Sequence, residues 1–349
     1  MLFFVSRKIY TIYKMTDLNE LLKHTSRSLY LSARLLPTDV RDGFCVAYLL
    51  CRYADSIADT SLLPPPQRAA WIKDFPSFLT HPQDKKWQQL PQTISSSATN
   101  IYEEQLLRNL PACLQAYAQL PAWQQPLILQ VVRAVCSGME IDLNTFPDEN
   151  SGTVRAFGTA GELENYCHLM GGEPGVFWSQ LIAHTVALPL KQEKFLALGK
   201  QIGDTLQIVN ILRDLPRDLR IGRCYFPQEE LQSYGLQPAD LLDEKNSTRF
   251  EQIKQKWISW ARQNLQAAYA YLRALPKSQL AHRAAVAWPV LWAADTLKKL
   301  AQESNLLDPQ VRVKIPRSRI YLTMLATPLI WASNTLFEKW LFCKLSDGK

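Results

Sequence analysis

The sequence predicts an all-α protein, because helical periodicity dominates it and strand-type alternation with hairpin turns is hard to find. The clearest periodicity lies at 253–275, where apolar side chains recur at steps of three and four residues. Polar, proline-rich connectors at 61–67, 81–100 and 145–152 separate some of the helical stretches. Further helices are expected at 17–33, 38–60, 101–119, 122–143, 160–187, 192–214 and 278–302.

The chain is expected to form one large domain over residues 17–343. Its 349 residues are 47% hydrophobic, so they can bury a sizeable core, and no connector marks a clear domain boundary. Residues 1–16 are predicted to be an N-terminal extension. They make a poor signal peptide, because Arg7 and Lys8 are charged and no small-residue cleavage site follows. The amphipathic pattern begins only after Met15, which makes Met15 an alternative native start.

Charge and cysteine usage narrow the class of protein. Lys and Arg number 39 against 32 Asp and Glu, a net charge of +7 that suits anionic partners such as phosphates and acidic lipids. The basic residues are scattered and no nucleic-acid-binding signature is found, so no nucleic-acid partner is expected. The seven cysteines have no CxxC spacing and several lie in apolar runs, which predicts reduced packing residues of a cytoplasmic protein.

Segment 320–337 is the stretch that bears on membrane contact, since it is uncharged and has basic residues on both sides. It includes two threonines, a serine, an asparagine and Pro328, whereas a transmembrane helix needs about 20 predominantly apolar residues. We therefore expect a final core helix that touches the bilayer interface, in preference to a transmembrane anchor. The predicted location is cytoplasmic and peripheral, at the inner face of a membrane.

The predicted helix at 38–60 carries an unusual polar face. Tyr48, Arg52, Asp55 and Asp59 follow one another at spacings of four, three and four, which puts them on one side of the helix. Carboxylates at this spacing repel each other, and burying them unpaired would be costly. Taken alone, such a face is typical of aspartates that pair with a nearby arginine on a solvated surface.

A second helix repeats the pattern. Gly203, Gln207, Asn210 and Asp214 have the same four, three, four spacing, and Asp218 continues the series. Magnesium takes carboxylate oxygens one or two at a time and keeps its other positions for water and substrate phosphates. Two facing aspartate pairs could therefore hold Mg²⁺ against a diphosphate and neutralise the charge that develops as the diphosphate leaves.

Arginines accompany both aspartate pairs. Arg52 precedes the first pair, while Arg213 adjoins the second pair and Arg223 follows it. Arg27 lies next to Ser26 near another predicted helix. Guanidinium forks match phosphate oxygens in geometry and charge, so these side chains are candidate diphosphate ligands.

Aromatic residues are candidates for the wall of a pocket that stabilises a carbocation, and equally for core packing. Tyr166 is the leading candidate, because it opens the stretch YCHLMGGEPG, where Gly171 and Gly172 would let another element approach closely. His168 and His184 have no partners at metal-ligand spacing and are expected to be structural. The aromatic candidates are Tyr48, Tyr53, Tyr166, Phe177 and Trp178.

Five motifs resemble the squalene and phytoene synthase family, whose members join two prenyl diphosphates head to head. They follow the family's order between residues 20 and 320, and NILRD with the downstream GRxYFP is the most specific. The resemblance implies the all-α isoprenoid synthase bundle, with a central pocket and the aspartates at its mouth. The motifs are SRSLYLS at 26–32, YLLCRYADSIADT at 48–60, CSGMEIDL at 136–143, YCHLMGGEPG at 166–175 and QIVNILRDLPRDLRIGRCYFP at 207–227.

By position, the resemblance assigns roles to individual residues. Tyr166 and Tyr48 are the catalytic candidates, with Tyr166 near the reacting carbons. VKIPR at 313–317 resembles a basic segment that squalene synthases use near NADPH, with Lys314 and Arg317 as the matching cations. The metal-binding residues implied are Asp55, Asp59, Asp214 and Asp218. The diphosphate-binding residues implied are Ser26, Arg27, Arg52, Gln207, Asn210, Arg213 and Arg223.

The activity implied is a magnesium-dependent condensation of two farnesyl diphosphates to presqualene diphosphate, followed by NADPH-dependent reduction to squalene. DLPRDLRIGRCYFP and GVFW at 175–178 look most like bacterial squalene-synthase-type members. The alternatives are a phytoene synthase and an enzyme that stops at presqualene diphosphate. A catalytically silent helical assembly factor is the non-enzyme alternative, and the four retained aspartates count against it.

Two departures from the family pattern bear on the site. Pro216 and Arg217 stand before Asp218, where an acidic residue is the commoner choice. A proline lacks the N–H for the helical ladder and disfavours helical geometry at the preceding residue, so we expect the helix to kink or end there. In the motif YCHLMGGEPG, which begins at Tyr166, the sequence GGEP at 171–174 replaces the family's usual AGxVG. This replacement changes the expected pocket wall.

Overall fold

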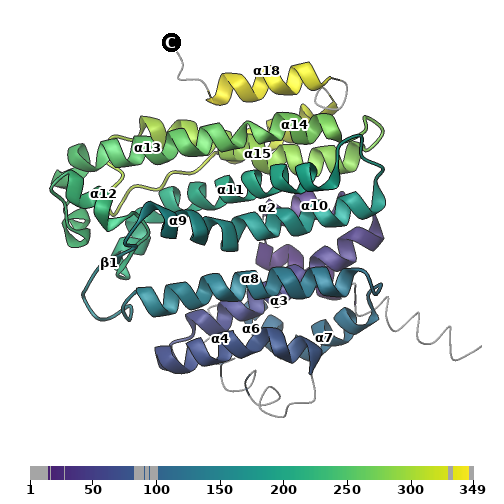
Figure 1. Ribbon diagram of the computed structural model, residues 1–349, viewed down its shortest axis with the longest axis horizontal. Coiled ribbons are helices and arrows are strands. Elements are labelled where there is room, and N and C mark those ends of the chain that lie inside the picture. Colours follow the sequence, from purple (N-terminus) through teal and green to yellow (C-terminus); the bar gives the residue numbers. More distant parts are fainter. Residues whose placement is uncertain are drawn as a thin grey trace, which may run out of the picture. The chain divides into compact units, whose positions relative to one another are not determined.

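The structure is a computed structural model that describes residues 15, 17–26, 28–81, 90, 94, 101–328 and 333–345. The prediction of an all-α protein is confirmed (Figure 1): within these residues, the strands are β1 (Arg155–Ala156) and β2 (Arg223–Cys224), of two residues each. The chain divides into two compact units, residues 1–143 and 144–349, and each is considered by itself. The predicted extension at 1–16 lies almost wholly outside the described residues.

In the first unit, α3 is the central helix, in contact with α2, α4, α6 and α7. Its inward face is apolar, and Tyr53 on that face stacks on Phe75 of α4 with ring centroids 5.5 Å apart. A helix over residues 17–26 precedes α2. The elements are α2 (Ser28–Ala33), α3 (Thr38–Asp59), α4 (Pro65–Thr80), α6 (Ile101–Arg108), α7 (Leu110–Gln119) and α8 (Gln124–Thr145).

Helix α4 was missing from the sequence prediction, which assigned 61–67 to a proline-rich connector. Pro64 is the N-cap of the helix, and Pro65 occupies its first turn. Proline is tolerated there, because the first N–H groups of a helix have no intrahelical acceptor and the fixed φ angle suits the helix. The prolines therefore mark the start of a helix that buries Ile72, Phe75 and Leu79, and the connector ends earlier than expected.

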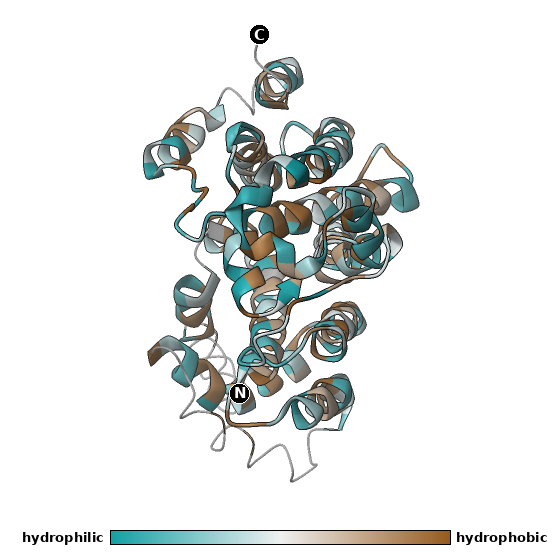
Figure 2. Ribbon diagram, turned by 90° about the vertical axis from the view of Figure 1, so that its left-hand side faces the viewer, coloured by the Kyte–Doolittle hydropathy of each residue, from teal (hydrophilic) through white to brown (hydrophobic). Residues whose placement is uncertain are grey.

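In the second unit, α11 is the central helix (Figure 1). It contacts α9, η2 and α10 as well as α13, α14 and α15. Figure 2 shows that the helices carry both hydrophilic and hydrophobic stretches, as expected for amphipathic elements around a core. The helices are α9 (Ala160–Cys167), η2 (His168–Gly172), α10 (Glu173–Thr185), α11 (Gln192–Arg220), α12 (Gln228–Ser233), η3 (Pro238–Leu242), η4 (Glu244–Asn246), α13 (Ser247–Leu265), α14 (Ala267–Ala274), α15 (Leu280–Gln302), α16 (Arg317–Leu325) and α18 (Asn334–Leu345).

Glycines let α11 approach η2 and α10 backbone to backbone. A Cβ on Gly171 would lie 2.2 Å from the carbonyl oxygen of Gly203, and one on Gly203 would lie 2.1 Å from that of Gly171. One turn further along, a Cβ on Gly175 would lie 2.2 Å from the oxygen of Gly199. The close approach expected at Gly171 is therefore present, and its partner is α11. η2 is a single π-helical turn, a feature that often marks functional sites.

The prediction that the helix is interrupted at Pro216 is wrong in its stronger form, because α11 does not end there and continues to Arg220. Leu215, Pro216 and Leu219 are all buried, so their packing offsets the hydrogen bond that proline cannot make. The guanidinium of Arg220 donates to the carbonyl oxygen of Pro216. Asp218 therefore lies within the helix, one turn after Asp214.

Segment 320–337 does not form the single core helix that the sequence predicted. α16 ends at Leu325 and α18 begins at Asn334, and Leu325 is 78% exposed. Among the described residues, no helix is long and apolar enough to cross a membrane.

The cysteines behave as expected in one respect, since all seven have free thiols. Six of them are buried or half-buried, and burial raises the pKa of Cys113 and Cys224 to about 12. Cys343 is the exception, because it is exposed on α18.

We predict that Gly203→Ala lowers the melting temperature by several degrees. The added Cβ would meet a backbone oxygen that cannot move without shifting a helix, and overpacking of this kind costs about 1–3 kcal/mol. Thermal unfolding followed by circular dichroism measures the change. Gly161→Ala is the matched control, because its nearest neighbour would be the Thr159 hydroxyl at 3.8 Å and alanine favours helices. Equal melting temperatures for Gly203→Ala and the wild type would contradict the close helix contact.

Candidate active site

In the first unit, α3 brings together most of the residues predicted for the first aspartate motif. The Tyr48 hydroxyl donates to the carbonyl oxygen of Thr25 at 3.0 Å, which ties α3 to the helix that carries Ser26. Ser26 is buried, and its hydroxyl donates to the carbonyl oxygen of Leu22 at 2.6 Å. Arg27 lies outside the described residues. The hydroxyls of Tyr48 and Ser26 are therefore already engaged with the backbone.

Arg52 and Asp55 form an ion pair on the outer face of α3, where the two side chains are 35% and 32% exposed. A second carboxylate lies nearby, since Nη2 of Arg52 is 3.8 Å from Oε1 of Glu103 on α6. Glu103 is only 12% exposed and also accepts a hydrogen bond from Ser56 at 3.1 Å. Asp59 is the exposed last residue of α3, one turn beyond Asp55. The guanidinium is thus held between carboxylates of two helices.

Glu103 was not found from the sequence. It lies 51 positions from Arg52 along the chain, and only an amphipathic helix beginning near Ile101 pointed to this region. The contact depends on how α6 packs on α3, which no local spacing encodes.

In the second unit, α11 repeats the arrangement of α3. Arg213 makes a two-pronged pair with Asp214, with Nε 2.9 Å from Oδ1 and Nη2 2.6 Å from Oδ2. This hydrogen-bonded pair raises the pKa of Arg213, and the charge of Asp218 adds to the effect. Each motif therefore consists of an Arg–Asp ion pair followed one turn later by a second aspartate. On the preceding turns of α11, Gln207 is half-buried and Asn210 is exposed.

Arg223 reaches its place through a sharp turn after α11. Gly222 has a φ angle of 83°, and a Cβ there would lie 2.6 Å from the carbonyl oxygen of Thr153, so a side chain is excluded. The chain then pairs β2 with β1 in parallel, and Arg223 becomes the register partner of Arg155. Arg223 also lies 3.4 Å from Glu149. Arg155 was missed by the sequence analysis, because nothing in its surroundings forms a motif.

Tyr166 is buried in a cluster of aromatic rings. Its ring stacks on Tyr225 with centroids 5.0 Å apart and lies 5.5 Å from Phe157. Tyr225 belongs to the motif GRCYFP, so the cluster joins two of the motifs noted in the sequence. Of the other aromatic candidates in the sequence, Tyr53 and Phe177 are buried in the cores of their units.

The two cations predicted to bind NADPH are exposed. Lys314 precedes α16 in a stretch without regular secondary structure, and its carbonyl oxygen accepts a hydrogen bond from Lys299 at 2.7 Å. Arg317 is the first residue of α16. Both side chains are accessible to an anionic ligand, and their role in cofactor binding stays a prediction.

A further polar cluster surrounds the π-helical turn η2. Asp204 of α11 is buried, and its carboxylate accepts from Lys200 at 2.7 Å. His168 of η2 lies 3.8 Å from Asp204 and 3.3 Å from Glu173. Burial raises the pKa of Asp204, and the contact with Lys200 opposes that effect only in part. His168, which the sequence predicted to be structural, lies in an ionisable cluster beside the Gly171–Gly203 contact.

The donor set of the two motifs suits a hard cation. Among the described residues, no group of three or more His, Cys, Asp or Glu is already gathered as a metal site. Each motif instead offers two carboxylates, and Mg²⁺ in proteins commonly takes one or two carboxylates together with substrate phosphates and water. Asp55 with Asp59, and Asp214 with Asp218, are the residues that fit such a role.

Comparison with known protein families identifies the family of this chain. The squalene/phytoene synthase family matches residues 22–319. The chain belongs to this family. Among curated relatives, it is 30% identical over 244 residues to a bifunctional lycopene cyclase/phytoene synthase of Pyrenophora tritici-repentis, covering 69% of this chain and 39% of that protein. It is 24% identical over 295 residues to a squalene synthase of Schizosaccharomyces pombe, covering 84% and 61%.

The chain spans about two to three fifths of the length of these two relatives, which carry different product names. A solved complex of TcSQS with the ligand BPH1237 superposes on the chain with a TM-score of 0.76 at 20% identity, over 97% of this chain and 94% of that one. This likeness confirms the isoprenoid synthase fold.

We predict that Asp204→Asn raises the melting temperature at pH 7. The folded-state pKa of Asp204 lies above the ordinary aspartate value of 3.8, so the ionised carboxylate costs stability at neutral pH. That cost disappears as the pH falls through the raised pKa, and the variant should lose its advantage near pH 4. Thermal unfolding at both pH values measures the difference.

Lys200→Gln is the opposing control for this prediction. Removing the lysine leaves the buried carboxylate without its closest cation, so the variant should be destabilised at pH 7 and less so near pH 4. A destabilised Asp204→Asn at pH 7 would show that the ionised pair with Lys200 stabilises the fold.

Proposed function

We propose that the chain catalyses the magnesium-dependent head-to-head condensation of two prenyl diphosphates. One observation carries the proposal: in a member of the squalene/phytoene synthase family, α3 and α11 present the same unit, an Arg–Asp ion pair followed one turn later by a second aspartate. A solvated surface needs no such repetition, whereas a diphosphate with its cations needs carboxylates and guanidinium groups together.

The exposure of the ion pairs supports this role. The side chains of Arg52, Asp55, Arg213 and Asp214 are between 32% and 43% exposed, so neither pair is locked in the core. Separating a partly exposed ion pair costs little, about 0–1 kcal/mol. We infer that substrate binding exchanges the partners, with the guanidinium groups turning to phosphate oxygens and the carboxylates to Mg²⁺.

The proposal assigns each group of residues a role that matches its chemistry. Bound Mg²⁺ would neutralise the charge that develops on the departing diphosphate. Arg52, Arg213 and Arg223 would orient the diphosphate by paired hydrogen bonds, with Gln207 and Asn210 donating from the same helix. In this proposal the ring or hydroxyl of Tyr166 lies near the reacting carbons, where it would stabilise the carbocation. Tyr48 is the second catalytic candidate, beside the first aspartate motif.

The product proposed is squalene, formed from two farnesyl diphosphates by way of presqualene diphosphate and a reduction by NADPH. Lys314 and Arg317 would bind the cofactor phosphates. Phytoene from C20 substrates is the second candidate, and the similarity to part of a bifunctional lycopene cyclase/phytoene synthase of Pyrenophora tritici-repentis supports it. Both products are insoluble in water, which fits release at the inner face of a membrane.

Incubation of the purified chain separates these candidates. The reactions contain Mg²⁺ and either farnesyl or geranylgeranyl diphosphate, each with and without NADPH, and mass spectrometry identifies the products. We expect squalene only when farnesyl diphosphate and NADPH are both present. Phytoene from the C20 substrate would support the second candidate, while an absence of product from either substrate would support a non-catalytic helical assembly factor.

Asp55→Asn and Asp214→Asn should each lower kcat by at least about a hundredfold, because each removes an anionic metal ligand while keeping the side-chain shape. Steady-state kinetics across a range of Mg²⁺ concentrations measures the loss, and a higher Mg²⁺ requirement is expected for any residual activity. Asp74→Asn on the exposed face of α4 is the matched control. Turnover near the wild-type value in either variant would refute the metal assignment.

Asp218→Asn should be as damaging as Asp214→Asn. Because α11 continues to Arg220, Asp218 stays on the same face as Asp214 despite Pro216. The same kinetic assay, run beside Asp214→Asn, tests this expectation. A mild effect confined to Asp218 would mean that the proline has turned its carboxylate away from the metal.

A further inference from the structure

Arg52 of α3 divides its guanidinium group between two carboxylates. Nη1 forms the ion pair with Asp55 on the same helix, and Nη2 lies 3.8 Å from Oε1 of Glu103 on α6. The two carboxylates therefore engage different nitrogen atoms of one cation. Glu103 lies in none of the family motifs found in the sequence, and the proposed function gives it no role.

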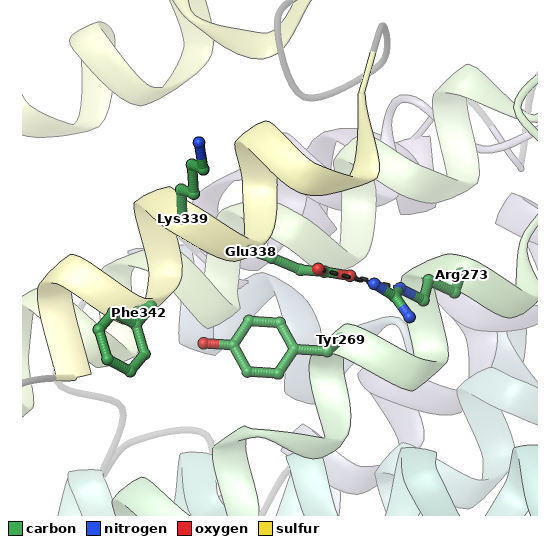
Figure 3. A pocket seen from close by; sticks show the side chains of 5 residues that line it. All are labelled: Tyr269, Arg273, Glu338, Lys339 and Phe342. Carbon is green, nitrogen blue, oxygen red and sulfur yellow. Dashed lines mark hydrogen bonds and ion pairs between the residues drawn. The ribbon is translucent and has the colours of Figure 1, made fainter.

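Two other arginines of the chain pair with a carboxylate in a different geometry. Arg213 donates from Nε and Nη2 to the two oxygens of Asp214. Arg273 of α14 pairs in the same two-pronged way with Glu338 of α18 (Figure 3), where Nη2 lies 2.8 Å from Oε2. In both cases one guanidinium group is committed to one carboxylate. Arg52 can instead lose one carboxylate and keep the other.

Glu103 is the less accessible of the two partners of Arg52. Its side chain is 12% exposed, compared with 32% for Asp55. Oε1, the oxygen that faces Nη2, also accepts a hydrogen bond from the buried Ser56 at 3.1 Å. A carboxylate that water reaches poorly depends more on its cation than an exposed carboxylate does. We therefore expect Arg52 to separate from Asp55 before it separates from Glu103.

Packing of three helices holds Glu103 beside α3. The ring of Tyr102, the preceding residue on α6, stacks on His24 with centroids 3.9 Å apart. His24 belongs to the helix that precedes α2, where Thr25 accepts the hydrogen bond of Tyr48 from α3. This helix therefore contacts both α6 and α3, and the place of Glu103 is set by packing as well as by its charge.

The ion pair with Arg52 competes with metal binding by Asp55. Asp55 cannot give its full charge to a metal ion while it pairs with Arg52, and a guanidinium group left unpaired nearby would repel the ion. Glu103 removes this conflict, because its carboxylate stays with Nη2 when Nη1 and Asp55 separate. The released Nη1 can then donate to a phosphate oxygen of the substrate.

We propose that Glu103 is a positioning residue for the first aspartate motif, which retains Arg52 through Nη2 while Asp55 turns to the metal. This inference rests on the proposed metal role of Asp55. Within the described residues, Arg213 of α11 has an ion pair with Asp214 alone, so the support by a third carboxylate is particular to the first motif. The first motif is therefore prepared for the exchange of partners before substrate arrives.

Binding of Mn²⁺ to the full chain, measured by electron paramagnetic resonance without substrate, tests the proposal. Mn²⁺ is the probe, because carboxylate sites suit Mn²⁺ and Mg²⁺ alike. Glu103→Gln should weaken Mn²⁺ binding by about tenfold, as the loss of a residue that supports a metal ligand commonly does. Equal affinities in Glu103→Gln and a wild type that binds Mn²⁺ would overturn this inference alone. A wild type that binds no Mn²⁺ would refute the metal role of Asp55 and this inference with it.

Glu104→Gln is the matched control for the charge that is removed. Glu104 is the next residue on α6, is 42% exposed and accepts from Nε of Arg108 at 2.9 Å. It lies on the same helix but pairs with an arginine of that helix, so its variant should bind Mn²⁺ as the wild type does. If Glu104→Gln weakened binding as much as Glu103→Gln, the net charge of α6 would be the cause, and the proposal would fail.

A double-mutant cycle with Arg52→Gln shows whether Glu103 acts through the guanidinium group. Once residue 52 is neutral, no cation is left for Glu103 to retain, so adding Glu103→Gln should change the Mn²⁺ affinity by no more than about twofold. A loss that stays tenfold in this background would mean that Glu103 itself binds the metal, which would overturn the positioning role. Ser56→Ala keeps every charge and removes only the hydrogen bond to Glu103, so it should weaken Mn²⁺ binding in the same direction by a smaller factor.

Steady-state kinetics gives a second measurement that a purely structural role would not change. In Glu103→Gln, the Mg²⁺ concentration at half-maximal activity should rise by about tenfold, and kcat at saturating Mg²⁺ should fall by a smaller factor. Asp55→Asn should show the opposite balance, because it removes a metal ligand. A loss of kcat in Glu103→Gln as large as that in Asp55→Asn, with an unchanged Mg²⁺ requirement, would overturn the proposal.

Discussion

The backbone contact between α11 and the η2–α10 segment is the constraint on which the second unit depends. A Cβ on Gly171 or on Gly203 would lie within 2.2 Å of the carbonyl oxygen of the other glycine. Gly175 and Gly199 repeat this contact one turn further on. The same helix contact places Gly171 close to Gln207, because a Cβ on Gly171 would lie 2.8 Å from the Cβ of Gln207. The polar face of α11 therefore begins where the two backbones meet, and its position is fixed by packing that allows almost no displacement.

The two aspartate motifs share one electrostatic arrangement. In each, a guanidinium lies against the first aspartate, and the second aspartate follows one turn later. Arg52 has the additional carboxylate of Glu103 beside it, while Arg213 has the charge of Asp218 within reach. Like-charged carboxylates can share a helix face because a cation stands beside them, and such a face is well suited to receive a metal-bound diphosphate.

The C-terminal helices follow a different rule. Asp295 pairs with both Lys344 of α18 and Arg319 of α16, and α18 also buries Phe337 and Leu341, whereas Leu325 of α16 is exposed. Burial lowers the pKa of Lys344, and the neighbouring Asp295 counteracts this effect. A buried ion pair in this place does more to orient two helices than to stabilise them, because the desolvation of both charges consumes most of their attraction.

The sequence by itself determined the all-α class, the helices at 38–60 and 160–187, and the repeated spacing of polar residues on two helices. These features are local, because a period of 3.6 residues appears in any window of a few turns. The tertiary structure decided the features that depend on contacts between distant segments. Examples are Glu103 beside Arg52, Arg155 in register with Arg223, and the pairing of Asp295 with both Arg319 and Lys344. It also carried α11 through Pro216, because the buried neighbours of the proline outweigh its local preference against a helix.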